Sequence, residues 1–306
     1  MSRAADAATV AAFRVGWRAL RALPERLAYS LFDAVADVVT RRGGPSVERL
    51  RANYARIRPD LTDRELDDEV RQGVRSYLRY YCEAFRLPAM SGERIDRVVR
   101  TEGLDDLTAE LRAGRPVLAF LGHTGNWDLA GAWCARHLGT VVTVAERLEP
   151  EEMFTAFLDF REGLGMRILP AEKGVYGQLR AQLQTGEPVV MPLLADRDLT
   201  ATGVAVDLRG HRAQMAAGTA ALAIDTGVRL WPVTMRHERV GDTWGMVIHC
   251  HDEVLPTPGL THAEQVAAMT QQCADALGEA VAGSPRDWHM MQRVFHEDLD
   301  LDRLPT

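Results

Sequence analysis

The chain has 306 residues, of which 46% are hydrophobic, 26% charged and 7% aromatic, as is typical of a soluble globular protein. A formal net charge of -7 argues against nucleic-acid binding, because proteins that neutralise many phosphates carry a basic excess. No run of about 18 uncharged apolar residues occurs, so no transmembrane helix is predicted. The four cysteines form no C-x-x-C pair, which predicts buried free thiols in a reducing compartment rather than disulfides or a zinc site.

The first 58 residues are rich in arginine and poor in carboxylates. Residues 7–42 predict two helices, separated near Leu23-Pro24. The first helix has an apolar face and an arginine-rich face, formed by Val10, Phe13, Trp17 and Leu20 on one side and by Arg14, Arg18 and Arg21 on the other. This pattern is typical of a helix in a membrane interface, and equally of one that packs on its own domain. Since the N-terminus shows no signal-peptide pattern, we expect a peripheral protein on the cytoplasmic face of the cell membrane.

The remaining chain predicts helices first and then alternating strands and helices. Helices are predicted over 46–57 and 63–86, and again over 104–113, 126–138, 151–164, 175–184, 216–226 and 262–282, before a polar tail over 298–306. Strands are predicted over 98–102, 116–121, 141–145, 166–169, 188–194, 204–208, 229–236 and 245–250. This alternation predicts an α/β fold with a mostly parallel central sheet flanked by helices. We expect one domain over residues 1–306, with a helical membrane-associating region over 1–90 and an α/β core over 96–297.

The strongest chemical signal is a histidine placed between a strand and a helix. The apolar run 117–121 ends in Gly122-His123-Thr124-Gly125, and a helical pattern follows. Asp128 lies five residues after His123, and a turn at the histidine lets the two side chains converge. A carboxylate that fixes the imidazole tautomer makes histidine a general base for a hydroxyl near neutral pH. Because this stretch has no serine or cysteine, we expect direct attack by an activated hydroxyl, without a covalent enzyme intermediate.

Simpler interpretations of these residues are also open. Asp128 could only complement the dipole of the following helix, and His123 could be an ordinary turn histidine. His249 and His251 flank Cys250 on a predicted strand and would share a face, but no third ligand is apparent, so no metal site is predicted.

The motif from His123 to Asp128 resembles the H-x4-D/E motif of the bacterial lysophospholipid acyltransferase superfamily, in the branch of the lipid A lauroyl and myristoyl acyltransferases. The chain is most similar to the actinobacterial phosphatidylinositol mannoside acyltransferases. The likeness covers nearly the whole chain and includes Leu194-Ala195-Asp196-Arg197-Asp198-Leu199, Met215-Ala216-Ala217-Gly218-Thr219-Ala220 and Asp287-Trp288-His289-Met290-Met291-Gln292. It implies transfer of a palmitoyl-like chain from acyl-CoA to the mannose 6-hydroxyl of a phosphatidylinositol mannoside in the inner leaflet. Acyl-CoA is then a substrate, and no cofactor is implied.

The resemblance also implies roles for single residues. His123 is the general base, and Asp128 occupies the acidic position of the motif. A second carboxylate is implied as the hydrogen-bonding partner of the imidazole, and chain order places it at Asp196, with Asp198 as the alternative. Both flank Arg197 just after a buried strand, at a sheet edge where ligands bind, although an Asp-Arg-Asp loop could simply hold itself together.

The implied acceptor site contains Glu146 and Arg161, because a carboxylate can bind sugar hydroxyls and a guanidinium can bind a phosphate. Arg197 and Asp198 are predicted to bind substrate as well. Other functions compatible with the sequence are acyl transfer to another lysolipid or a lipid A-like acceptor, hydrolysis of acyl-CoA with His123 activating water, and lipid binding without catalysis.

Overall fold

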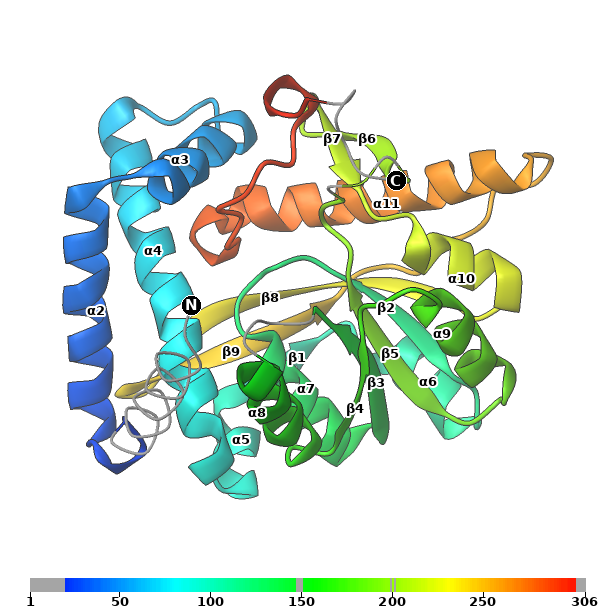
Figure 1. Ribbon diagram of the computed structural model, residues 1–306, viewed down its shortest axis with the longest axis horizontal. Coiled ribbons are helices and arrows are strands. Elements are labelled where there is room, and N and C mark those ends of the chain that lie inside the picture. Colours follow the sequence, from blue (N-terminus) through cyan, green and yellow to red (C-terminus); the bar gives the residue numbers. More distant parts are fainter. Residues whose placement is uncertain (1–19, 147–150, 199, 201, 301–306) are drawn as a thin grey trace.

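A computed structural model describes residues 20–146, 151–198, 200 and 202–300 (Figure 1). It confirms the predicted α/β class with a mostly parallel central sheet. The main sheet has seven strands in the order β1-β9-β8-β2-β5-β3-β4. All neighbouring pairs are parallel except β8 and β9, so β9 and β1 run opposite to the other strands. The strands of this sheet are β1 (Val99–Glu102), β2 (Val117–Leu121), β3 (Thr140–Ala145), β4 (Met166–Pro170), β5 (Val189–Leu194), β8 (Leu230–Val240) and β9 (Thr243–Cys250).

Helices cover both faces of this sheet (Figure 1). The α-helices are α2 (Glu25–Arg42), α3 (Pro45–Ile57), α4 (Asp63–Arg86), α5 (Gly92–Val98), α6 (Asp105–Arg112), α7 (Trp127–His137), α8 (Glu151–Glu162), α9 (Val175–Gln184), α10 (Gly218–Thr226) and α11 (His262–Gly283). Side-chain alternation along β2 divides the core: Leu118 and Phe120 pack with α9, α10 and α11, whereas Ala119 and Leu121 pack with α6 and α7. Every residue of β2 is buried, which explains its unbroken apolar sequence.

The N-terminal helices pack beside the sheet as a separate layer (Figure 1). A capping box between Thr62 and Glu65 starts α4, the longest of the described helices. The predicted helices over 46–57 and 63–86 match α3 and α4 closely. The first predicted amphipathic helix lies almost wholly outside the described residues. Among the helices that are described, none is long and apolar enough to cross a membrane.

Several local predictions were wrong or incomplete. The strand predicted over 204–208 is β6 of a two-stranded hairpin whose partner, β7 (His211–Met215), was not predicted. The short helix α5 was also missed. The predicted polar tail begins too early, because the carboxylate of Asp298 pairs with Arg49 and lies 2.8 Å from Arg56. All four cysteines are free thiols, but Cys134 is only half-buried.

Candidate active site

The turn between β2 and α7 has a fixed shape. Asn126 caps α7, because its side-chain oxygen accepts the N–H of Leu129 at 3.0 Å. Gly125 has a φ of +54°, and a Cβ there would lie 2.8 Å from the Cβ of Met235. Only glycine fits both the left-handed backbone and this close approach. The turn therefore presents His123 at the carboxyl edge of the parallel strands, where α/β proteins bind ligands.

Strand register brings Asp196 to His123. Leu121 and Leu194 are paired in the parallel strands β2 and β5, and each active-site residue lies two positions beyond its strand. The imidazole Nδ1 is 2.6 Å from Asp196 Oδ1, and the His123 backbone N–H donates to Oδ2 at 2.8 Å. Asp196 is fully buried, whereas the His123 side chain is 23% exposed. Of the three carboxylates considered from the sequence, Asp196 is the one that the structure places against the imidazole.

Electrostatics define the protonation of this pair. Burial alone would raise the pKa of Asp196, but the nearby His123 imidazole and the hydrogen bonds from His123 and Trp288 outweigh it, so the pKa is lowered. An ionised carboxylate only accepts hydrogen bonds, so Nδ1 of His123 must carry the proton that is donated to Asp196. Nε2 then keeps its lone pair. The pair can accept a proton at Nε2 and stabilise the resulting imidazolium through Asp196.

Asp128 has different partners. Its carboxylate, 1% exposed, lies 2.6 Å from Nε of Arg161 and accepts the hydroxyl of Tyr80 at 2.9 Å. Burial would lower the pKa of Arg161, but the charge of Asp128 outweighs burial and raises it. Asp128, the acidic residue of the motif, therefore forms an ion pair with Arg161 of α8. Arg161, predicted to bind a phosphate, lies in an ion pair within the protein.

The other predicted substrate-binding residues lie at the same edge of the sheet but are not all brought together. Glu146 directly follows β3, is exposed, and lines a pocket beside Arg161. Arg197 donates to the side chain of Gln292. Asp198 accepts the backbone N–H of Thr200 at 2.7 Å, within its own loop.

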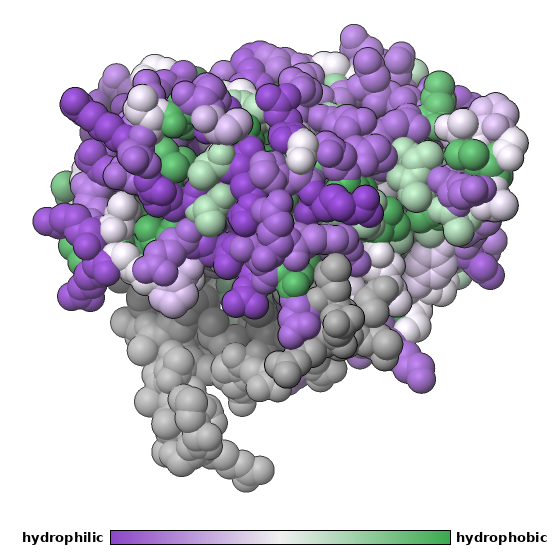
Figure 2. All heavy atoms as spheres, turned by 90° about the horizontal axis from the view of Figure 1, so that it is seen from above, coloured by the Kyte–Doolittle hydropathy of each residue, from purple (hydrophilic) through white to green (hydrophobic). Residues whose placement is uncertain are grey.

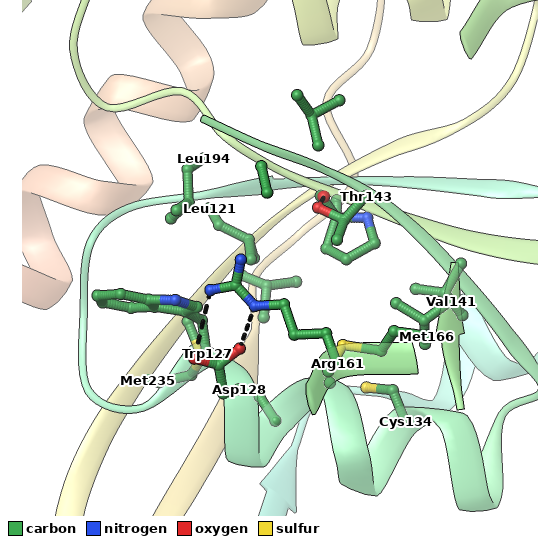
Figure 3. Close-up of a pocket in the computed structure, with 18 of the residues that line it drawn as sticks. Leu121, Trp127, Asp128, Cys134, Val141, Thr143, Arg161, Met166, Leu194 and Met235 are labelled. Atoms are coloured by element: carbon green, nitrogen blue, oxygen red, sulfur yellow. Dashed lines mark hydrogen bonds and ion pairs between the residues drawn. The ribbon is translucent and has the colours of Figure 1, made fainter. Parts of the chain in front are cut away.

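An apolar pocket of about 320 Å³ lies between α7, α8 and strands β3 and β4. Figure 3 shows Trp127, Leu121 and Leu194 at one end, Val141, Met166 and Cys134 at the other, and the Asp128–Arg161 pair between them. Trp127 also contacts the histidine edge-on, with ring centroids 5.6 Å apart. Trp127 therefore both lines the pocket and contacts the imidazole of His123. Its lining is mostly aliphatic and aromatic, which suits a hydrocarbon chain.

Two further residues of the site were not predicted from the sequence. Tyr80 reaches Asp128 from α4, and the indole N–H of Trp288 donates to Asp196 at 2.9 Å. The only signal for Trp288 was its place in the family-like stretch 287–292.

The described residues contain no group of three or more His, Cys, Asp or Glu side chains arranged to hold a metal ion. His249, on β9, and His251, just beyond the end of β9, lie side by side as expected, with ring centroids 4.2 Å apart. His251 Nε2 lies 2.8 Å from the hydroxyl of Thr234.

A histidine–carboxylate pair lies at the carboxyl edge of the sheet, next to an apolar pocket. This arrangement is the one expected of an enzyme that acts on a lipid. Residues 2–297 match the bacterial lipid A biosynthesis acyltransferase family. A phosphatidylinositol mannoside acyltransferase of Mycolicibacterium smegmatis is 41% identical over 295 residues, which cover 95% of this chain and 92% of that protein. One from Mycobacterium tuberculosis is 40% identical over 303 residues, covering 97% and 91%.

The protein is therefore an acyltransferase. The chain belongs to the bacterial lipid A biosynthesis acyltransferase family, as its sequence resemblance predicted.

Proposed function

We propose that this acyltransferase moves a palmitoyl-like chain from acyl-CoA to the 6-hydroxyl of a mannose on a phosphatidylinositol mannoside. It works peripherally, on the cytoplasmic face of the cell membrane. The observation that carries the proposal is the His123–Asp196 pair beside the apolar pocket of about 320 Å³. The names of the two mycobacterial relatives support the choice of acceptor.

In the proposed reaction His123 is the general base. Its Nε2 takes the proton of the acceptor hydroxyl while the hydroxyl oxygen bonds to the thioester carbonyl carbon. The negative charge that develops on the carbonyl oxygen returns when the carbon–sulfur bond breaks. The imidazolium, stabilised by Asp196, then gives its proton to the departing thiolate of coenzyme A. Because the thioester is already activated, this route needs no covalent enzyme intermediate, metal or cofactor.

In this proposal the two substrates bind in different parts of the site. The hydrocarbon chain of the donor fills the apolar lining between Trp127 and Met166. The acceptor approaches over the carboxyl edge of the sheet, where Glu146 follows β3 and can hydrogen-bond sugar hydroxyls. Arg197 and Asp198 follow β5 at the same edge. Arg161 contributes positive charge at this edge while remaining paired with Asp128.

A transfer assay tests the function directly. Labelled palmitoyl-CoA is incubated with phosphatidylinositol mannosides, lipid A precursors or lysophospholipids, and products are identified by mass spectrometry. We expect an acylated mannose as the main product, and loss of that product in His123→Ala without a change in melting temperature. Release of free coenzyme A at the same rate without acceptor would indicate a thioesterase. Lipid binding without any turnover would indicate a binding protein.

A further inference from the structure

The chain that follows α11 runs along the catalytic turn. Its 3-10 helix η2 (Pro285–Asp287) packs against α4 (Figure 1). The Gly125 N–H donates to the carbonyl of Asp287 at 2.9 Å, and the His289 N–H donates to the carbonyl of His123 at 2.8 Å. Thr124 and Trp288 form an antiparallel bridge between these hydrogen bonds. The turn is thus paired, residue by residue, with the segment Asp287–His289.

Trp288 extends this pairing to the side chains. It is fully buried, and its indole N–H donates to Asp196 Oδ2 at 2.9 Å. The same oxygen accepts the backbone N–H of His123 at 2.8 Å, while Oδ1 faces the imidazole Nδ1 at 2.6 Å. The two donors on Oδ2 fix the rotation of the carboxylate, so Oδ1 is held for the imidazole. An N–H donor also stabilises the negative charge of the carboxylate.

Hydrogen bonds from three elements hold the segment that carries Trp288. The backbone carbonyl of Trp288 accepts a hydrogen bond from the hydroxyl of Tyr54, on α3, at 2.9 Å. The neighbouring carboxylate of Asp287 accepts the hydroxyl of Ser76 at 2.8 Å and lies 2.8 Å from Nδ1 of His237. Asn53 donates to the carbonyl of Met290 at 2.7 Å. Contacts from α3, α4 and β8 therefore place the indole where it meets Asp196.

We propose that Trp288 is a positioning residue of the His123–Asp196 pair. Its indole N–H orients the carboxylate and shares its negative charge, so Trp288 sets how strongly Asp196 holds the imidazole in its protonated form. This inference rests on the proposed general-base role of His123.

The neighbouring ionisable groups are neutral or have partners outside the His123–Asp196 pair, and Arg197, next to Asp196 in the chain, donates to Gln292. His289 is buried, and burial together with the charge of His237 lowers its pKa to about 3, so it is neutral. Asp287 is paired with His237. Asp128 is paired with Arg161. Within the part of the chain that the structure describes, the side chains that hydrogen-bond to Asp196 are the indole of Trp288 and the imidazole of His123.

Removing the indole N–H has an effect of predictable sign. With one donor fewer, the carboxylate keeps more negative charge for the imidazolium, so His123 must lose its proton at higher pH. The Trp288–Asp196 hydrogen bond exists in both protonation states of His123, and only the part of it that changes on protonation shifts the pKa of His123. We therefore expect a rise of about half a pH unit. Below the midpoint, the fraction of neutral His123 and the transfer rate should fall about threefold.

The test uses the full chain with Trp288→Phe and, in a second variant, 3-benzothienylalanine at position 288. The second substitution keeps the ring shape and replaces only N–H by sulfur, so it remains informative if the phenylalanine variant does not fold. Trp231→Phe is the matched control, because Trp231 is also a buried tryptophan but lies on β8 with its ring beside Arg229.

Two measurements are compared across pH: the transfer rate, and carbethoxylation of His123 by diethyl pyrocarbonate, read by mass spectrometry. Of the two protonation states of an imidazole, only the neutral one reacts with this reagent, and the reaction requires no lipid substrate. We expect both midpoints to rise by about half a pH unit in the Trp288 variants and to stay constant in Trp231→Phe. Unshifted midpoints in folded Trp288 variants overturn the inference. A wild-type protein that shows the modification midpoint but no transfer would contradict the proposed function instead.

Discussion

Asp196 and Asp198 are only two residues apart, yet their carboxylates face different groups. Asp196 is buried against the imidazole of His123, whereas Asp198 accepts the backbone N–H of Thr200. Strand register explains the difference, because only a residue two positions beyond Leu194 matches His123 two positions beyond Leu121. The two residues therefore make a matched pair for testing the base.

We predict that Asp196→Asn lowers kcat/KM for acyl transfer by roughly 10³-fold or more. An amide can present its NH₂ to Nδ1, which favours the wrong tautomer, and it cannot stabilise the imidazolium. Asp198→Asn should stay within a few-fold of wild type. Melting temperatures provide the control for folding. Equal losses in both variants would contradict the assignment of Asp196 as the partner of His123.

The ion pair between Asp128 and Arg161 is a second feature at this scale. Since Asp128 is 1% exposed and the Arg161 side chain 17% exposed, removing one partner leaves a poorly solvated charge. We predict that Asp128→Asn lowers the free energy of unfolding by about 3 kcal/mol. The double variant Asp128→Asn/Arg161→Met should recover most of this loss. Urea titrations of wild type, Asp128→Asn, Arg161→Met and the double variant measure the coupling, and purely additive effects would show that the pair is not coupled.

The candidate site was predictable only where a short stretch of sequence encodes it. The position of His123 follows from an apolar strand ending in a glycine-flanked turn, and Asp196 follows a second buried strand. The partners of Asp128 were not predictable, because Tyr80 and Arg161 come from α4 and α8, and their meeting depends on how these helices pack. Trp288 is equally remote, at 92 residues from Asp196.

At the scale of whole elements, the strongly patterned ones were predicted and the weakly patterned ones were not. The sequence predicted the helices α3, α4 and α9 and the buried strands β2 and β5. Their burial requires apolar residues at a regular spacing or in an unbroken run, which can be recognised in the sequence. β7 was missed because its sequence, His-Arg-Ala-Gln-Met, lacks β-branched residues and clear alternation. α5 has only seven residues, too few for a helical period to stand out.

A buried cluster of charged side chains joins β8, η2 and α4. His237 of β8 lies 2.8 Å from Asp287 of η2 and 3.4 Å from Glu83 of α4. Burial would lower the pKa of His237, but the charge of Glu83 and the hydrogen bond to Asp287 outweigh it and raise the pKa to about 9. Glu83 also accepts the side-chain amide of Asn126 at 2.8 Å, so the cluster supports the catalytic turn.

The pKa of His237 predicts a pH-dependent stability. Its value is raised above the ordinary value of 6.5, so the stabilisation is fully present below about pH 6.5 and is lost as the pH rises through about 9. We predict that the loss is on the order of 3 kcal/mol. Urea titrations at pH 6, 8 and 10 should show the difference between wild type and His237→Gln narrowing as the pH rises. A constant difference would mean that His237 is neutral in the folded protein.

Hydrophilic and hydrophobic side chains are unevenly distributed over the surface of the molecule. The face that carries α3, α11 and the β6–β7 hairpin, seen from above in Figure 2, is mostly hydrophilic, with hydrophobic residues scattered across it. By contrast, α2 at the edge of the molecule (Figure 1) exposes a row of aliphatic side chains at helical spacing, formed by Leu27, Leu31, Val35, Val38 and Val39. A continuous apolar stripe on a basic N-terminal region is typical of a membrane-facing helix.

Charges along α2 favour a lipid surface as well. Two of its three carboxylates, Glu25 and Asp37, are paired with arginines of other elements, whereas Arg41 and Arg42 occupy its last turn. We predict that Leu27→Ser/Leu31→Ser/Val35→Ser weakens sedimentation with anionic vesicles about a hundredfold, since each side chain contributes about 1 kcal/mol when it leaves water. Leu255→Ser is the matched control, because Leu255 is 58% exposed but lies outside α2. Because the triple variant leaves His123 and the pocket untouched, acyl transfer to detergent-dispersed acceptor should be unchanged while transfer to vesicle-bound acceptor falls. Equal vesicle binding by both variants would show that α2 does not face the bilayer.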